Sequence, residues 1–212
     1  MVPVPNSPTL IYVTNPMCAW CYGFTAVVRR LRALWQGRLN VQVLLGDLNA
    51  YAEEPLLPEE KERLAVSWHR VQERTFLPFD YRFFKQSAFV YDTEPACRAI
   101  LCVRLLRPVL TLEVLRALHS AFYVDGLDLK NTDVLVRIVS MFGISENLFL
   151  ALFESDEIKQ QLEDEFGYVD DMGATSFPSV FLVTEHGAEK LSHGFCELHE
   201  LEQRLLQVMS EQ

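Results

Sequence analysis

Two cysteines separated by two residues stand where a β-prone run gives way to a helical pattern. The run Thr9–Thr14 is rich in β-branched and aromatic residues, which favours a buried strand, and Asn15-Pro16 ends it. Cys18 and Cys21 follow directly and therefore lie at the start of the next element. That element is an amphipathic helix, because apolar residues recur at intervals of three and four: Phe24, Val27, Val28, Leu31 and then Leu34 or Trp35.

Strand and helix signals divide the rest of the chain into three parts. Gly37 ends the first helix and Asn40–Leu45 supplies a second strand, so the chain opens as a right-handed strand–helix–strand unit. Residues 58–168 contain helical segments and no convincing strand. Beyond them come a β-prone run at 178–183 and a partner strand at 190–193. A final helix then carries an apolar stripe on Leu198, Leu201, Leu205 and Val208.

These signals predict an α/β fold in which one domain is interrupted by a large all-helical insertion. Residues 1–55 and 172–212 would form the interrupted domain, and residues 56–171 would form the inserted one. An insertion of this length lies within the usual range of domain sizes. Helices are expected within it at residues 58–74, from 93 to about 107, around 112–122, after 131–133, and in one or two pieces over 148–166.

The charge of the chain argues against two classes of partner. Its 212 residues include 19 Lys plus Arg against 29 Asp plus Glu, a net charge of −10. Nucleic acids and anionic membranes are bound through clustered cations, so neither is expected. Residues 1–8 lack the cationic start and apolar run of a signal peptide, and no uncharged apolar stretch reaches about 18 residues. These observations predict a cytoplasmic protein.

The spacing Cys18-Ala19-Trp20-Cys21 suits redox chemistry. A sulfur at the first turn of a helix lies at the positive end of the helix dipole, which stabilises a thiolate. Cys18 would therefore attack a disulfide, and Cys21, one turn inside the helix, would resolve the mixed disulfide. The dithiol itself is the redox group, so no further cofactor and no metal is expected. The five cysteines do not resemble a structural disulfide framework.

A zinc site is the structural alternative, because half a zinc site has the same cysteine spacing. His193, Cys196 and His199 form an H-x-x-C-x-x-H pattern that would supply the other half of a non-catalytic metal-binding module. Trp20 is bulky for a tight metal knuckle, and the cysteine pair opens a helix instead of lying in a glycine-rich loop. Redox chemistry is therefore favoured over zinc.

A second feature lies far away along the chain. The segment Thr175-Ser176-Phe177-Pro178-Ser179-Val180 places a proline directly before a strong strand, where a cis peptide bond is a known device. With the dithiol, this arrangement resembles the thioredoxin superfamily and its DsbA-like branch, in which a helical domain is inserted into a thioredoxin fold. Three segments are similar to the FrnE-type group of predicted protein-disulfide isomerases: Asn15-Pro16-Met17-Cys18-Ala19-Trp20-Cys21-Tyr22-Gly23-Phe24, Asp92-Thr93-Glu94-Pro95-Ala96-Cys97-Arg98-Ala99 and Ala121-Phe122-Tyr123-Val124-Asp125-Gly126.

The resemblance implies a substrate site around the dithiol. Pro178 would be cis and face the Cys18 sulfur, and the backbone of Phe177 would pair with an extended substrate peptide. The turn at Gly194-Phe195 would border the same groove. Trp20, Phe177 and Phe195 would form an apolar surface for peptide segments, although a core role is an equal alternative for the two phenylalanines. Protein or peptide disulfides are the implied substrates, and glutathione is an implied redox partner.

Two departures from the DsbA-like pattern concern the direction of electron flow. Strongly oxidising members have Pro-His between the cysteines, where this chain has Ala19-Trp20. Many members also place an acid six residues before the nucleophile, where this chain has Tyr12. An isomerase or reductase direction is therefore favoured over an oxidase. A second alternative is a kappa-type glutathione-dependent transferase or isomerase acting on a small molecule, although those relatives generally lack the cysteine at the position of Cys21.

The remaining cysteines and histidines suggest no separate chemistry. Cys97 and Cys102 lie five apart on a predicted helix, too far around it to bridge easily, and are expected to pack in the core. Cys196 is expected to be an ordinary packed cysteine, with a third redox thiol as the alternative. His119 is expected to be a surface or hydrogen-bonded core residue.

Overall fold

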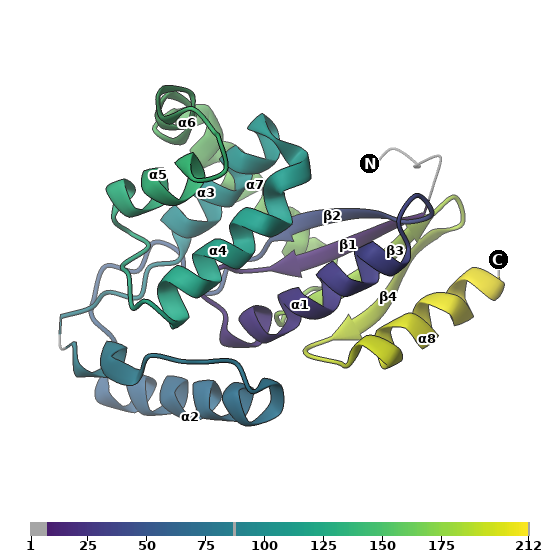
Figure 1. The fold of residues 1–212 in the computed structure, drawn as a ribbon, viewed down its shortest axis with the longest axis horizontal. Helices are drawn as coiled ribbons and strands as arrows, with labels where there is room; N and C mark the ends of the chain where they lie inside the picture. The colour runs from purple at the N-terminus through teal and green to yellow at the C-terminus, as the bar shows by residue number, and fades with distance from the viewer. Residues whose placement is uncertain (1–7, 87, 212) are drawn as a thin grey trace.

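The computed structural model describes residues 8–86 and 88–211 of the chain. Its sheet has four strands, β1 (Thr9–Thr14), β2 (Asn40–Leu45), β3 (Ser179–Thr184) and β4 (Gly187–His193), in the order β2-β1-β3-β4 (Figure 1). Strand β1 runs parallel to β2 and antiparallel to β3. The β3–β4 hairpin is antiparallel, with an irregularity in register after Val180. Strand β4 begins three residues earlier than the start at residue 190 that the sequence predicted.

Helices cover both faces of this sheet. On one face lie α1 (Ala19–Leu34) and α8 (Leu198–Ser210), packed on Leu10 and Tyr12 of β1 (Figure 1). The alternate side chains of β1 point to the opposite face, where they join a smaller apolar cluster with α7 (Asp156–Asp171). Because β1 is buried on both faces, its sequence is a continuous apolar run instead of an alternation.

The inserted segment is helical, as predicted. Its helices are α2 (Pro58–Thr75), α3 (Glu94–Leu106), α4 (Thr111–Tyr123), α5 (Thr132–Ser140), α6 (Glu146–Phe153) and α7, with short 3-10 turns at Tyr81–Lys85 and Pro108–Leu110. The region expected at 148–166 is two helices, because Ser155 caps a new one by accepting a hydrogen bond from the Ile158 amide at 3.3 Å. Within the described residues, the segment's strand pairing is limited to an isolated bridge between Pro55 and Val90.

A buried ion pair joins the insertion to the edge of the sheet. Glu165 of α7 accepts a hydrogen bond from the Leu45 amide of β2 at 2.7 Å. Arg104 of α3 pairs with Glu165 and also donates to the Val43 carbonyl oxygen at 2.6 Å. These contacts cap part of the open edge of β2. They tie α7 to the sheet, while the division at residues 55/56 and 171/172 stays a prediction.

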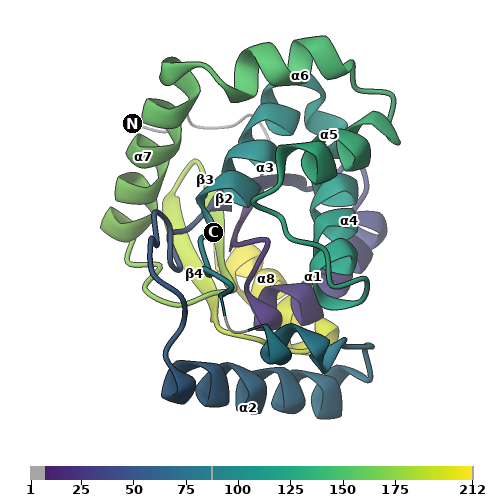
Figure 2. The same cartoon turned by 90° about the vertical axis from the view of Figure 1, so that its left-hand side faces the viewer.

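Helix α2 stands apart from the other inserted helices and runs past the N-terminal end of α1 (Figure 2). Gly23 of α1 makes this approach possible, since a Cβ there would lie only 3.0 Å from Thr75 and 3.2 Å from Val71 of α2. The dithiol end of α1 therefore has an inserted helix as its neighbour. In the described part of the chain, no helix combines the length and apolarity needed to cross a membrane.

Candidate active site

Cys18 is the N-cap residue of α1, and Cys21 lies in the first turn of this helix. Cys18 is 8% exposed and Cys21 is fully buried, and neither forms a disulfide. The Cys18 sulfur lies at the positive end of the helix, where the backbone amides of Trp20 and Cys21 contribute to lowering its pKa. This is the position that the C-x-x-C spacing predicted.

The side chain of Asn15 holds the turn between β1 and the dithiol. Its amide donates to the Gly46 carbonyl at 3.0 Å, the Thr93 hydroxyl at 3.2 Å and the Cys97 sulfur at 3.3 Å. Its carbonyl oxygen accepts from the Met17 amide at 2.9 Å. One buried residue thus ties the turn to the end of β2 and to the start of α3, a role that the sequence did not reveal.

Two buried tyrosines from the insertion fix Met17, the residue before Cys18. The hydroxyls of Tyr91 and Tyr123 both donate to the Met17 carbonyl oxygen. Tyr22, which follows the dithiol, stacks on Tyr123 with ring centroids 5.0 Å apart. The sequence linked the Tyr123 segment to the family only through resemblance, and this stacking gives the segment a structural role.

The proline loop, residues 176–178, lies against Cys18. The Phe177–Pro178 peptide bond is cis, as the resemblance implied, and the Cys18 thiol donates to the Phe177 carbonyl oxygen at 3.6 Å. The Gly194 amide donates to the Pro178 carbonyl oxygen at 2.7 Å, which brings the turn after β4 to the same place. Residues 159 positions apart in sequence thus share one site.

The two thiols have opposite acidities. The pKa of Cys18 is lowered from the ordinary 9.0, chiefly because the Cys21 side chain donates a hydrogen bond to it and also because of the backbone amides at the helix start. The pKa of Cys21 is raised well above 9.0, mainly by its burial and next by the hydrogen bond with Cys18. At neutral pH the Cys18 sulfur is therefore the better nucleophile of the two.

A network of neutral side chains lies beneath Cys21. Thr14 donates to the Tyr12 hydroxyl at 3.0 Å, and the Tyr12 and Thr25 hydroxyls lie 3.1 Å apart. Thr25 also contacts the Nδ1 atom of His119 at 3.3 Å. Burial raises the pKa of Tyr12 well above 10.0 and lowers that of His119 to about 3, so both are uncharged at neutral pH. His119 is the hydrogen-bonded core residue that was one of the two expectations for it.

An open groove of about 790 Å³ borders the dithiol. Its lining includes Trp20, Phe177, Gly194, Phe195 and Cys196. Trp20 and Phe195 are in contact, with ring centroids 5.7 Å apart. The predicted apolar residues are therefore brought together. The Phe177 ring has a second role, since it packs against the second-face cluster of the sheet.

The other cysteines are buried and separate. Cys97 and Cys102 pack within α3, and burial raises the pKa of both thiols, that of Cys102 to about 12. Cys196 precedes α8 and has a raised pKa for the same reason. His193 contacts Ser176 at 3.0 Å. Among the described residues, no three His, Cys, Asp or Glu side chains converge as metal ligands would.

Comparison with known proteins agrees with this architecture. The family model for the DSBA-like thioredoxin domain matches residues 9–206. A predicted protein disulfide isomerase from Nitrosomonas europaea is 32% identical, with a TM-score of 0.91, over 97% of this chain and 99% of that one. The cytosolic disulfide reductase DsbM from Pseudomonas aeruginosa is 22% identical, with a TM-score of 0.77, over 95% and 98% of the two chains. The structure of DsbM with GSH is also 22% identical, with a TM-score of 0.76, over 95% of this chain and 98% of that one. A search of curated proteins found no match. With the dithiol at the start of α1 and the sheet interrupted by helices, the chain belongs to the DsbA-like thioredoxin-domain family.

Proposed function

We propose that this protein is a thiol-disulfide oxidoreductase that acts on protein or peptide disulfides in the isomerase or reductase direction. The observation that carries the proposal is the thiol of Cys18, with its lowered pKa, lying 3.6 Å from the Phe177 carbonyl oxygen. A reactive sulfur that lies beside the Phe177 backbone suits a disulfide within an extended chain, which can pair with that backbone.

The proposed mechanism uses the two sulfurs in turn. The Cys18 thiolate attacks one sulfur of a substrate disulfide, which forms a mixed disulfide and releases the other substrate sulfur as a thiolate. Cys21 then loses its proton and attacks the Cys18 sulfur, which releases the second substrate thiol. The substrate disulfide gains two electrons, and the dithiol becomes the Cys18–Cys21 disulfide. For isomerisation, the released substrate thiolate attacks the mixed disulfide before Cys21 does.

The direction follows from what surrounds the thiolate. The two residues between the cysteines carry no cation, and the network below Cys21 is neutral. A less stabilised thiolate makes the dithiol form less favoured over the disulfide, so the centre is a weaker oxidant. DsbM, of the same fold, is a cytosolic disulfide reductase. We place this protein in the cytoplasm as well, with glutathione as a redox partner.

Insulin reduction tests the division of roles. Cys18→Ala should abolish the activity, because the nucleophile is lost. Cys21→Ala should retain the first step and accumulate a mixed disulfide on Cys18, visible by mass spectrometry under non-reducing conditions. Cys102→Ala, a buried cysteine of α3, is the matched control and should keep near wild-type activity. Full activity of Cys18→Ala would refute the proposal.

A further inference from the structure

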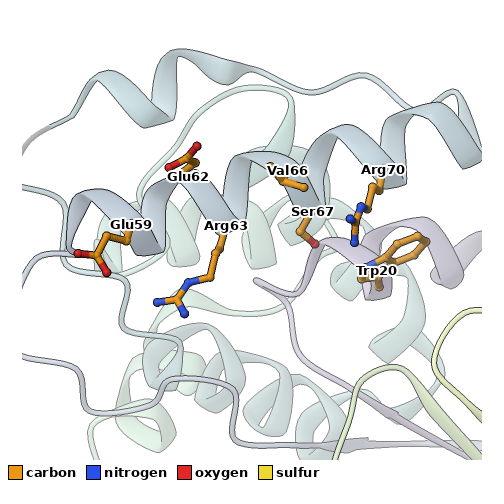
Figure 3. Close-up of a pocket in the computed structure, with 7 residues that line it drawn as sticks. All are labelled: Trp20, Glu59, Glu62, Arg63, Val66, Ser67 and Arg70. Carbon is orange, nitrogen blue, oxygen red and sulfur yellow. The ribbon is translucent and has the colours of Figure 1, made fainter.

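A second groove of about 600 Å³ begins at Trp20 and runs along α2. Its lining carries two arginines, Arg63 and Arg70, and two glutamates, Glu59 and Glu62. Figure 3 shows the Arg70 guanidinium beside the Trp20 indole, and Arg63 extending from the same side of the helix toward the body of the protein. This groove is separate from the substrate groove but shares Trp20 and Arg70 with it.

The four charged side chains of this groove are exposed on α2. In the parts of the chain that the structure describes, none of these four side chains forms a salt bridge. One turn further along α2, Arg74 does pair with a carboxylate, that of Glu197, at 3.0 Å. In a chain with a net charge of −10, two unpaired arginines that line one groove indicate an anionic ligand.

The spacing of the charges limits the size of that ligand. Arg63 and Arg70 are seven residues apart on one helix, about 10 Å along its axis. A tripeptide has a similar reach when it is extended, about 10 Å. Glutathione carries a carboxylate at each end, one ammonium group and a central thiol. Two arginines flanked by glutamates complement this set of charges.

We propose that the α2 groove binds the carboxylates of a small thiol peptide of the glutathione class while its sulfur reacts at Cys18. Arg70, beside Trp20, takes one carboxylate and Arg63 takes the other, and the ammonium group lies toward Glu59 or Glu62. This inference rests on the proposed dithiol chemistry and adds to it a site for a redox partner, with the two arginines as binding residues.

The reaction at this site balances without another reagent. The Cys18 thiolate attacks one sulfur of glutathione disulfide and releases one glutathione. Cys21 then attacks the Cys18 sulfur and releases the second. The two thiols of the dithiol are oxidised to a disulfide, one glutathione disulfide is reduced to two glutathione molecules, and the two thiol protons pass to the products. In the reverse direction, two glutathione molecules reduce the protein disulfide.

The test compares two disulfides that differ in charge. The second-order rate constant for oxidation of the reduced full-length protein is measured with glutathione disulfide and with uncharged bis(2-hydroxyethyl) disulfide. For Arg63→Gln/Arg70→Gln we expect a fall of about tenfold with glutathione disulfide and less than about twofold with the uncharged reagent. Arg116→Gln, at an exposed arginine of α4, is the matched control and should change neither rate.

Two further measurements sharpen the assignment. Added salt should slow the reaction of the wild-type protein with glutathione disulfide more than that of the double variant, because it screens the arginine charges. The disulfide of glutathione glycyl ethyl ester, in which the glycine carboxylates are esterified and uncharged, should be insensitive to one of the two single arginine substitutions. Sensitivity to both would contradict the assignment of one carboxylate to each arginine.

Other outcomes separate this inference from the proposed function. Equal losses with both disulfides, or no loss with glutathione disulfide, would overturn the α2 groove as a glutathione site. A loss confined to insulin reduction would assign the arginines to a protein partner instead. A wild-type protein that reacts with neither disulfide would refute the dithiol chemistry itself, and the groove inference with it.

Discussion

The hydroxyl of Tyr12 donates a hydrogen bond to the carbonyl oxygen of Cys21, 3.3 Å away. This tyrosine stands at the position where the resemblance to DsbA-like proteins implies an acid. Its phenol takes part in a set of hydroxyl contacts with Thr14 and Thr25, and it carries no charge at neutral pH. The polar contacts beneath Cys21 thus come from hydroxyl groups at the place where the resemblance implies a carboxylate.

Removing that hydroxyl should lower the stability of the fold. Tyr12→Phe leaves the Thr14 and Thr25 hydroxyls and the Cys21 carbonyl each with one partner fewer in a fully buried site. We expect the free energy of unfolding to fall by about 1–3 kcal/mol, measured by urea denaturation. Tyr168→Phe, at an exposed tyrosine of α7, is the control and should be nearly neutral. Equal stability of Tyr12→Phe and wild type would contradict the network.

The buried histidine should make stability depend on pH. The pKa of His119 is about 3 in the folded protein because of its burial, against 6.5 for an unperturbed imidazole. Between these values the unfolded chain binds one more proton, so stability falls as the pH decreases through this window. From pH 7 to pH 5 the loss should be about 2 kcal/mol.

Urea denaturation at both pH values measures this effect as a difference between variants. His119→Gln should remove most of the loss, although its stability at pH 7 will be lower. His199→Gln, at an exposed position of α8, should leave the loss unchanged and controls for a general effect of removing a histidine. An identical pH dependence in wild type and His119→Gln would show that this imidazole is not the group responsible.

Alkylation should show that Cys21 controls the acidity of Cys18. The rate at which iodoacetamide modifies Cys18 rises with pH as the thiolate forms, and the midpoint should lie below the ordinary pKa of 9.0. Cys21→Ala removes the hydrogen bond that is the main cause, so the midpoint should move to higher pH. Mass spectrometry of the peptide that contains Cys18 measures the rate. A midpoint that does not move would assign the acidity to the helix start alone.

The glycine at the end of β2 should be needed for the proline loop. A Cβ at Gly46 would lie 2.1 Å from the Phe177 ring, so the ring and its backbone must shift in Gly46→Ala. We expect a stability loss of about 1–3 kcal/mol and slower insulin reduction, because the Phe177 carbonyl adjoins Cys18. Gly167→Ala in α7, where a Cβ would meet nothing within 4 Å, should have neither effect.

Local patterns in the sequence were sufficient for the elements of the fold. The β-prone runs at Thr9–Thr14 and Asn40–Leu45, the helical spacing after Cys18 and the absence of a convincing strand over 58–168 predicted the interrupted α/β architecture. The structure confirms these elements because each signal depends only on neighbours a few residues away along the chain. The break at Ser155 was left open, because the cap that starts the second helix is a single local hydrogen bond.

The cysteine spacing alone also determined which sulfur occupies the start of the helix, because helix geometry puts Cys18 at the N-terminal end and Cys21 one turn later. The partners of these sulfurs were decided only by the tertiary structure. Asn15 contacts Thr93 and Cys97, and His119 contacts Thr25, through side chains separated by 78 to 94 positions. Burial, hydrogen bonding and acidity depend on such distant neighbours, and no local period in the chain encodes them.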